Sequence, residues 1–408
     1  MNIIFSRRAL LKASSAALMP VGLSTLANPA LAAASPEPSG SRLPNWFKYN
    51  PSLTTTWDFS VASPSGDRVR ATAIGFDGAA LTKILALYAR PSSAYDIAIS
   101  EMLNIFDDKN MHLAVDVVYY DSKPELAAAA IHRAEGDGTK VIIAMGSDTT
   151  SLLWDTYRNG KIPVVTACSK DPVILGQIAN YDTGSATNFA FTSLNMPIDA
   201  QVGYLMRLRP KLQNVAVLVD ASNVSAVETQ ATPVAEYLNQ RNIRALKLAV
   251  TNSSTAVQEL PQLMQHAISA MKRNDPTLQN SVFWITGSTA IFDQIHIINA
   301  LSDKVPVISV VPEVVRAGDD SAVLSVGVSF ESNAHLAAIY VGYVLEGTKS
   351  VGDIPVGIVS PPDIAINFRE AKRIGLKIPF SFFESSATVF DYDGKPARVN
   401  GVTLTKSI

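Results

Sequence analysis

The stretch Val141–Thr150 reads Val-Ile-Ile-Ala-Met-Gly-Ser-Asp-Thr-Thr, an apolar run that ends at Gly146 and continues into small polar residues. Unbroken hydrophobicity of this kind is typical of a parallel strand that helices cover on both faces. Residues 147–158 are predicted to form the next helix, with 147–150 as its first turn. In α/β sheets, ligands bind outside the carboxyl ends of the strands, where such a first turn lies.

The same order occurs again in the second half of the chain. Residues 282–289 read Val-Phe-Trp-Ile-Thr-Gly-Ser-Thr, and a helix and a Pro-Val strand follow each copy, the strands at 162–165 and 305–308. Predicted strands and helices alternate throughout this region, which favours doubly wound parallel sheets. We therefore predict an α/β fold of two doubly wound parallel-sheet lobes, joined by a multi-strand hinge, whose strand ends face a common cleft.

Pattern and composition divide the chain into five parts. We expect a twin-arginine-type signal peptide at 1–32, a linker and N-terminal extension at 33–80, lobe 1 at 81–195 plus about 320–350, lobe 2 at 196–315 plus about 351–385, and a C-terminal tail at 386–408. Inside the extension, 54–59 and 68–74 suit the two strands of a hairpin. A short helix is expected between Asp171 and residue 188.

The first residues have the form of an export signal. Arg7-Arg8 is flanked by Ser6 and by Leu10-Leu11-Lys12, a weakly apolar core follows, and 30–32 is a small-x-small cleavage site. An ordinary secretory leader that happens to carry two arginines is the alternative. The chain has one cysteine, Cys168, so no lipid-anchored cysteine lies near the cleavage site. We expect a periplasmic protein that is not a lipoprotein and has no stable membrane insertion, because no later apolar run reaches the length of a spanning helix.

Bulk composition limits the classes of function. With 408 residues, 47% of them apolar, the chain can bury the cores of two domains. A net charge of -2 without strong asymmetry makes nucleic acid an unsuitable partner. A single cysteine excludes internal disulfides and a four-cysteine zinc site.

Polar side chains at the predicted strand ends are the candidate ligand-binding residues. They are Ser92, Ser93, Tyr95, Ser147, Asp148, Thr149, Ser169, Asp171, Asn195, Ser222, Asn223, Ser225, Ser288, Thr289 and Glu313. Hydroxyls and helix N-terminal amides would bind a carboxylate, Asp171 or Glu313 an ammonium, and Tyr95 an apolar or aromatic body. The alternative is purely local: helix caps for the hydroxyls, a loop-stabilising bond for Asp171, a surface role for Glu313 and a helix start for Tyr95.

Motifs of catalysis and cofactor binding are absent from the sequence. No Gly-x-x-x-x-Gly-Lys-Ser/Thr follows a predicted strand, and no Gly-x-Ser-x-Gly is present. The five histidines are scattered without metal-ligand spacing. We therefore expect no cofactor, no metal and no enzymatic activity.

The C-terminal third resembles a known family. Residues 351–356 read Val-Gly-Asp-Ile-Pro-Val, and 364–379 read Ile-Ala-Ile-Asn-Phe-Arg-Glu-Ala-Lys-Arg-Ile-Gly-Leu-Lys-Ile-Pro. Together with 162–165, Lys170–Val173 and Leu345-Glu346-Gly347, they are similar to the ABC-transporter substrate-binding proteins that include tryptophan- and tyrosine-type binding proteins. The resemblance covers about 83–385 and implies a type I periplasmic-binding fold with a ligand held between two lobes and delivered to an ABC permease. Residues 181–188 depart from the family's usual turn.

These observations predict an exported solute-binding protein for a small polar ligand, with amino-acid-like molecules favoured. Contacts of the ligand to both lobes would favour a closed state that a permease recognises. The alternative is a ligand-sensing or envelope interaction module of the same fold. An enzyme of this architecture would need a nucleophile–base pair or a metal cluster.

Overall fold

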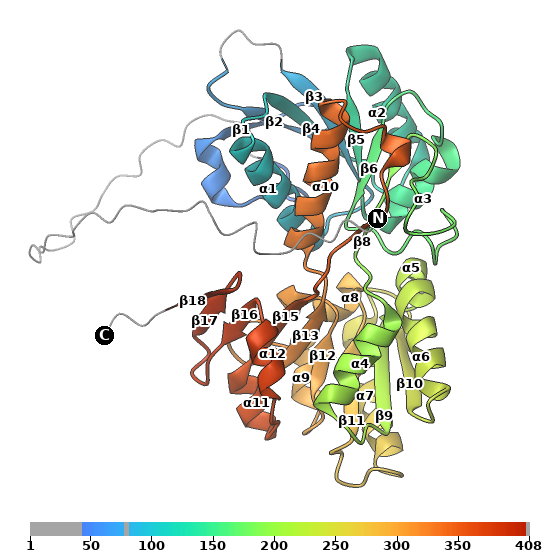
Figure 1. The fold of residues 1–408 in the computed structure, drawn as a ribbon, viewed down its shortest axis with the longest axis vertical. Helices are drawn as coiled ribbons and strands as arrows, with labels where there is room; N and C mark the ends of the chain where they lie inside the picture. Colours follow the sequence, from blue (N-terminus) through green and yellow to red (C-terminus); the bar gives the residue numbers. More distant parts are fainter. Residues whose placement is uncertain (1–42, 77–80, 405–408) are drawn as a thin grey trace, which may run out of the picture.

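The computed structural model describes residues 43–76 and 81–404, which form two α/β lobes, one above the other in Figure 1. A seven-stranded sheet in the order β1-β2-β4-β3-β5-β6-β7 is the centre of the first lobe. A nine-stranded sheet in the order β10-β9-β11-β12-β13-β15-β16-β17-β18 is the centre of the second. The predicted two-lobed α/β fold is confirmed.

In the first lobe the strands are β1 (Trp57–Val61), β2 (Arg68–Ala73), β3 (Thr82–Tyr88), β4 (Leu113–Tyr119), β5 (Val141–Met145), β6 (Val164–Ala167) and β7 (Phe189–Ala190), and β8 (Thr192–Ser193) pairs with β14 (Gly357–Ile358). Its helices are η2 (Pro51–Thr55), α1 (Ser93–Asp108), α2 (Pro124–Asp137), α3 (Gly146–Thr156), α10 (Phe330–Leu345) and η5 (Val351–Asp353).

In the second lobe the strands are β9 (Asn214–Asp220), β10 (Arg244–Val250), β11 (Ser281–Ile285), β12 (Val307–Ser309), β13 (Leu324–Gly327), β15 (Asp363–Asn367), β16 (Thr388–Phe390), β17 (Pro396–Val399) and β18 (Val402–Thr403). Its helices are α4 (Ile198–Leu208), α5 (Val224–Ala226), η3 (Val227–Ala231), α6 (Thr232–Asn239), α7 (Ala256–Met271), α8 (Thr289–Phe292), α9 (Ile295–Leu301), η4 (Pro312–Val314), α11 (Phe368–Ile374) and α12 (Phe380–Ser385).

Each sheet is parallel at its centre and mixed at its edge. The five strands β4, β3, β5, β6 and β7 run parallel, as do β10, β9, β11, β12 and β13. All five residues of β5 are buried, as the unbroken apolar run predicted. The predicted parallel order thus holds for the centre of each sheet. At the edges, β1 and β2 form the antiparallel hairpin expected in the extension, and β15 pairs antiparallel with β13. The connection between β1 and β2 is too short for the crossover that parallel strands require.

The edge strands come from segments that the sequence placed outside the lobes. The hairpin β1–β2 lies within the expected extension 33–80 and joins the first sheet through β4. The strands β16, β17 and β18 lie within the expected tail and extend the second sheet. The expected signal peptide at 1–32 lies outside the described residues. Both termini of the described chain therefore add strands to a lobe.

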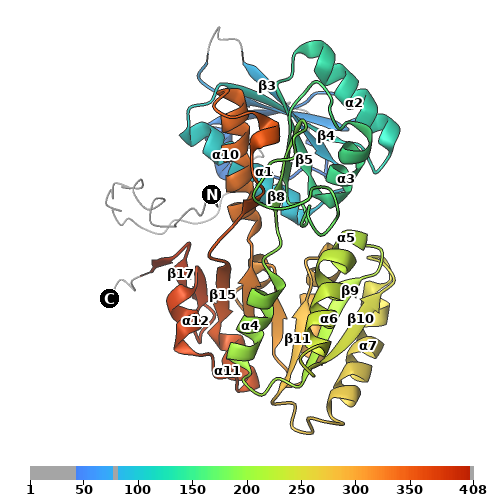
Figure 2. The ribbon, with the colours of Figure 1, turned by 45° about the vertical axis from the view of Figure 1, so that its right-hand side comes forward.

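The chain passes between the lobes at three places within the described residues: 194–197, 328–329 and 359–362. Figure 2 shows these connections close together between the upper and lower lobes. The range 320–350 is accordingly divided, since β13 belongs to the second sheet whereas α10 packs against α1 in the first lobe. The range 351–385 is divided as well, with β14 paired to β8 and β15 in the second sheet.

One expected helix is not formed. The segment 172–188 consists of turns and bends instead of the short helix predicted after Asp171. Pro172, Gly176 and Gly184 interrupt helical geometry, and Gly176 has a φ of 68°. The segment is closed by local bonds such as Gln177 N–H to Pro172 O at 2.8 Å.

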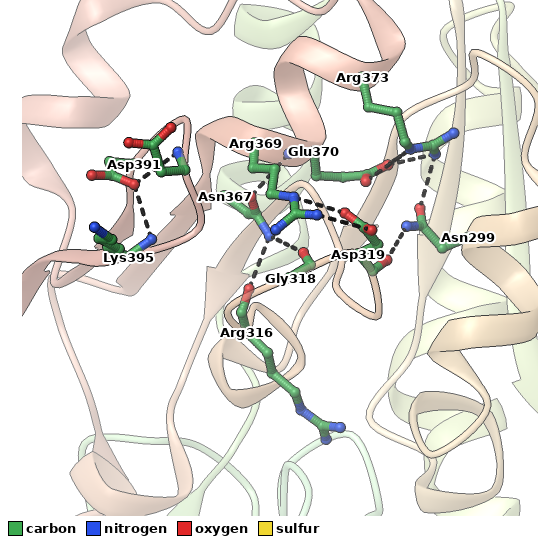
Figure 3. A network of polar contacts seen from close by, with 11 residues as sticks. Asn299, Arg316, Gly318, Asp319, Asn367, Arg369, Glu370, Arg373, Asp391 and Lys395 are labelled. Carbon is green, nitrogen blue, oxygen red and sulfur yellow. Dashed lines mark hydrogen bonds and ion pairs between the residues drawn. The ribbon is translucent and has the colours of Figure 1, made fainter.

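Residues of the motif at 364–379 form a network of hydrogen bonds and an ion pair on the second lobe, which we call the polar lock: Asn367, Glu370 and Arg373, with the carbonyl groups of Arg316 and Gly318 (Figure 3). Asn367, which is fully buried, accepts a hydrogen bond from Glu370 N–H at 2.9 Å and thereby caps α11. Its Nδ2 donates to the carbonyl oxygens of Arg316 and Gly318, both at 2.9 Å. One helical turn after the buried Glu370, Arg373 forms an ion pair with its carboxylate. The lock joins β15, α11 and the loop before β13.

Replacing Asn367 with alanine is expected to lower the free energy of unfolding by about 2–3 kcal/mol, because a helix cap and two buried hydrogen bonds are lost together. Denaturant unfolding followed by circular dichroism measures this change. Asn274→Ala, at an exposed position after α7, is the matched control and should leave the midpoint nearly unchanged. Equal midpoints for the two variants would contradict a stabilising role for the lock.

Candidate functional site

A small cavity of about 40 Å³ lies between the lobes, at the carboxyl ends of the central strands. Its walls are Arg90, Ser92, Ala94, Tyr95, Gly146, Ser147, Asp148, Cys168, Lys170, Leu194, Asn223, Ser225, Gly287, Thr289, Phe292 and Phe330. A space of this size holds about one water molecule. A larger ligand therefore requires the lobes to move apart about their connecting segments.

The first lobe contributes the start of α3. Gly146 has a φ of 80°, and a Cβ built there would lie 1.9 Å from the hydroxyl of Tyr95. Glycine is thus required both by the backbone conformation and by the close approach of the tyrosine. No side chain caps α3, whose first turn, Gly146 to Asp148, lines the cavity. Its uncapped backbone N–H groups and the positive end of its dipole favour negative charge at this wall.

The charges on the cavity wall do not balance. Arg90 and Asp148 form an ion pair at 3.1 Å. Lys170 is 6% exposed, and no carboxylate among the described residues pairs with it. Burial lowers the pKa of the Lys170 ammonium to about 8, against a weaker opposing effect of Cys168. The wall therefore carries one uncompensated positive charge.

Lys170 comes from the first lobe and reaches the second. Its backbone N–H donates to Ser147 Oγ at 3.0 Å, which fixes the loop after β6 against α3. Its Nζ lies against Gly287, because a Cβ built on that glycine would be 2.3 Å from the nitrogen. Gly287 N–H donates to Gln230 Oε1 at 2.7 Å. The backbone of Lys170 is thus held in the first lobe, while its ammonium group lies against the second.

Seven of the residues that the sequence selected lie on the cavity wall: Ser92, Tyr95, Ser147, Asp148, Asn223, Ser225 and Thr289. Three of them also make local hydrogen bonds. Ser92 Oγ accepts from Ala94 N–H and caps α1, and Asn223 Oδ1 accepts from Ala226 N–H and caps α5. Ser225 Oγ donates to Asn223 Oδ1 at 3.0 Å.

The other eight lie outside the wall. Ser93 is exposed at the start of α1, Thr149 is within 3.3 Å of Tyr120 Oη, and the Ser169 hydroxyl is buried. Asn195 donates to Thr229 O at 2.9 Å, so it joins a connecting segment to the second lobe. Ser222 donates to Asp220 at 2.7 Å, and Ser288 lies 3.2 Å from the Thr286 hydroxyl.

Asp171 and Glu313, the two carboxylates expected to bind an ammonium, have their own partners. Asp171 Oδ1 accepts from the backbone N–H groups of Val173 and Ile174, and Oδ2 accepts from Tyr181 Oη at 2.7 Å. Glu313 Oε1 accepts from Phe330 N–H at 2.6 Å, at the connection between β13 and α10. Burial raises the pKa of the Glu313 carboxyl to about 7, and the nearby Glu331 adds to the rise.

Stability should depend on the ionisation of Glu313. A carboxyl whose pKa rises on folding from 4.5 to about 7 binds protons more tightly when folded, so this contribution is fully present below pH 4.5 and is lost as pH rises through about 7. Relative to Glu313→Gln, which keeps an oxygen for Phe330 N–H, we expect the wild type to lose on the order of 2 kcal/mol over this interval. Denaturant unfolding at several pH values measures the difference, and a difference that is constant from pH 4.5 to 7.5 would exclude it.

Lys170 and Arg90 were missed as site residues. Both residues come directly after predicted strands, and this position is the reason their neighbours were selected. A lysine is usually exposed, however, and the burial of Lys170 depends on the second lobe. The apolar wall residues Leu194, Phe292 and Phe330 carry no polar signal in the sequence. Within residues 43–76 and 81–404, no group of His, Cys, Asp or Glu is arranged to hold a metal ion. In the same ranges, no helix is both long and apolar enough to cross a membrane.

Solved structures show the same fold. A conserved domain protein from Vibrio cholerae aligns with a TM-score of 0.61 at 17% identity, over 76% of this chain and 100% of its own. An ABC domain from Streptococcus pneumonia in complex with L-Trp aligns with a TM-score of 0.59 at 15% identity, over 76% of this chain and 100% of its own. A ligand-free, open substrate-binding protein with adhesive properties from Clostridium difficile aligns with a TM-score of 0.56 at 18% identity, over 73% and 96%.

No curated protein sequence matches this chain significantly. The family model described as "ABC transporter substrate binding protein" matches residues 99–389, well over half of the chain. This range contains most strands of both sheets, from β4 to β16, the three connections and most of the cavity wall. It also contains the motifs at 351–356 and 364–379 on which the resemblance rested. The chain belongs to the ABC transporter substrate-binding protein family.

Proposed function

We propose that this protein captures a small polar solute between its lobes and presents the closed form to an ABC permease. The observation that supports the proposal is the interlobe cavity, whose walls come from strand ends of both lobes and from the start of α10. A ligand that contacts both walls favours the closed arrangement by its differential affinity for the two states. The three connecting segments allow the lobes to rotate as bodies.

An amino-acid-like ligand is the first class to test. The uncapped start of α3 and the hydroxyls of Ser147, Ser225 and Thr289 suit a carboxylate. Tyr95 and Phe292 offer aromatic surface to an apolar body. The S. pneumonia relative in complex with L-Trp shows that this fold can hold an amino acid.

We also propose export to the periplasm by the twin-arginine route, which the Arg7-Arg8 motif supports. Cell fractionation of a strain that carries Arg7→Lys and Arg8→Lys tests the route. We expect the unprocessed precursor to remain in the cytoplasm. Normal export of this variant would favour an ordinary secretory leader.

A thermal-shift screen of the exported protein, purified after expression of the full-length chain, tests solute binding. The panel holds amino acids, nucleosides, thiamine-type compounds and small sugars. A ligand that binds only the folded state raises the melting temperature by mass action, by an amount that grows with its concentration. A saturable rise with one compound class supports the proposal. The absence of a rise with every compound counts against solute capture and favours an interaction with other proteins.

A further inference from the structure

We infer that the ligand carries a net negative charge and places its anionic group between Lys170 Nζ and the first turn of α3. The inference rests on the proposed function and specifies the solute. It makes Lys170 the residue that selects acids over neutral or cationic molecules of the same shape.

The first step is the charge on the cavity wall. Asp148 is matched by Arg90, and the remaining ionic group is the ammonium of Lys170. Removing an unpaired ammonium from water costs free energy that a hydrophobic substitute would avoid. A buried lysine in a ligand cavity is therefore explained by an anion that pairs with it when the site is filled.

The second step is the helix that faces Lys170. The first turn of α3 lines the same cavity without a side-chain cap, and Ser147 of this turn binds the backbone of Lys170. The start of α3 and Lys170 thus line the same cavity, and the loop that carries Lys170 is fixed to α3. Both favour negative charge, whereas a single helix end or a single lysine would fix its position less well.

The third step excludes a matched ammonium in the ligand. Asp171 and Glu313 lie off the cavity wall. Asp171 bonds within its own loop, whereas Glu313 Oε1 accepts from Phe330 N–H and Oε2 is buried without a hydrogen-bond partner. From the second lobe the wall receives Asn223, Ser225, Gly287, Thr289 and Phe292, none of which ionises. A zwitterion would bring one negative and one positive charge to a wall with an excess positive charge. An acidic amino acid or another organic acid, with one net negative charge, balances the wall.

The pH dependence of binding follows from the same groups. The titratable or charged groups around Lys170 are Arg90, Tyr95, Asp148 and Cys168, with Glu313 beyond Cys168. Since burial lowers the pKa of Lys170 to about 8, the ammonium is lost as pH rises above that value. Affinity for an acid should then fall by up to tenfold per pH unit above pH 8 in the wild type. In Lys170→Arg, whose guanidinium stays charged, it should remain constant.

The experiment compares acids with their neutral amides on the full exported protein. The probes are L-glutamate and L-glutamine, L-aspartate and L-asparagine, and indole-3-acetate and indole-3-acetamide, at equal ionic strength. Wild type, Lys170→Met, Lys170→Arg and the control Lys247→Met are measured by thermal shift and, for any binder, by calorimetry. Lys247 lies exposed in the middle of β10, the edge strand of the second sheet, and is not part of the cavity wall.

We expect an acid to bind the wild type and Lys247→Met, and its affinity to fall by roughly tenfold to a hundredfold in Lys170→Met. Without ligand, Lys170→Met should melt no lower than the wild type, because an unpaired buried charge is removed. A lower melting temperature with unchanged affinity would make Lys170 structural and overturn the inference. The inference is also overturned if the wild type binds an acid and its amide with equal affinity, or if Lys170→Met binds the acid as tightly as the wild type does. Either result leaves the proposed solute capture intact. The absence of binding by any probe or any solute of the larger screen overturns both proposals.

Discussion

Gly146→Ala is expected to lower the free energy of unfolding by roughly 2–5 kcal/mol, from the left-handed backbone and from steric overlap together. The φ of Gly146 is 80°, where a side chain is strained. The new Cβ would lie 1.9 Å from Tyr95 Oη and 2.7 Å from its Cζ. Tyr95 is buried and packs edge-on against Tyr88, with ring centroids 5.2 Å apart, so it has little room to withdraw.

Two variants separate these causes. Gly138 ends α2 with a φ of 83°, but a Cβ built there meets nothing within 4 Å. Gly138→Ala therefore measures the backbone strain alone, which we expect to cost about 1 kcal/mol. Adding Tyr95→Phe to Gly146→Ala removes the nearest clashing atom and should restore part of the stability. Denaturant unfolding of the wild type, Gly146→Ala, Tyr95→Phe and the double variant gives the coupling between the two positions.

The same substitution should also weaken ligand binding, because Gly146 and Tyr95 both line the cavity. A displaced Tyr95 ring would enter the space that a ligand occupies. Calorimetry with the solute identified in the screen measures this effect. Equal losses of stability in Gly146→Ala and Gly138→Ala would show that Tyr95 moves away freely, and would contradict a fixed cavity wall.

The fold was largely predictable because its strongest signals are local. The apolar run of β5, the glycine at its end and the Pro-Val strand at β6 lie within a few tens of residues, and parallel α/β order follows from them. The edge strands were not predictable in the same way. Whether β1–β2 or β16–β18 joins a sheet depends on an unpaired edge strand elsewhere in the sheet. The hydrophobic pattern of a segment does not indicate which edge strand it pairs with.

The residues of the candidate site were likewise predictable where the signal is local and unpredictable where it depends on distant parts of the chain. A polar residue at a strand end could be placed near the cavity from the sequence, as Ser147 and Thr289 show. Whether such a side chain faces the other lobe or its own loop is harder to predict, because hydrogen bonds to residues nearby in the sequence compete with hydrogen bonds to a ligand. Asn223, which caps α5, and Asp171, which binds its own loop, belong to this second kind. Lys170 is the converse case, since its burial requires Gly287 of the other lobe.

Asp171→Ala is expected to lower the free energy of unfolding by about 3 kcal/mol, because two backbone N–H groups and the Tyr181 hydroxyl lose their charged acceptor. The segment 172–188 has no regular helix or strand to replace these bonds. Tyr181→Phe, which loses one of the three, should show about a third of the effect. Asp182→Ala, at an exposed position of the same segment, is the matched control.

The sequence left two roles open for Asp171, a loop-stabilising bond and a contact to a ligand ammonium. The ammonium contact predicts a weaker affinity at unchanged stability. The two roles predict different effects of the substitution Asp171→Asn. Asp171→Asn keeps an oxygen for the N–H groups but removes the charge, so a structural role predicts a smaller loss of stability than in Asp171→Ala. An ammonium contact predicts an equal loss of affinity in both variants. Thermal unfolding and calorimetry on the same preparations therefore decide between them, and the carboxylate's three internal bonds favour the structural role.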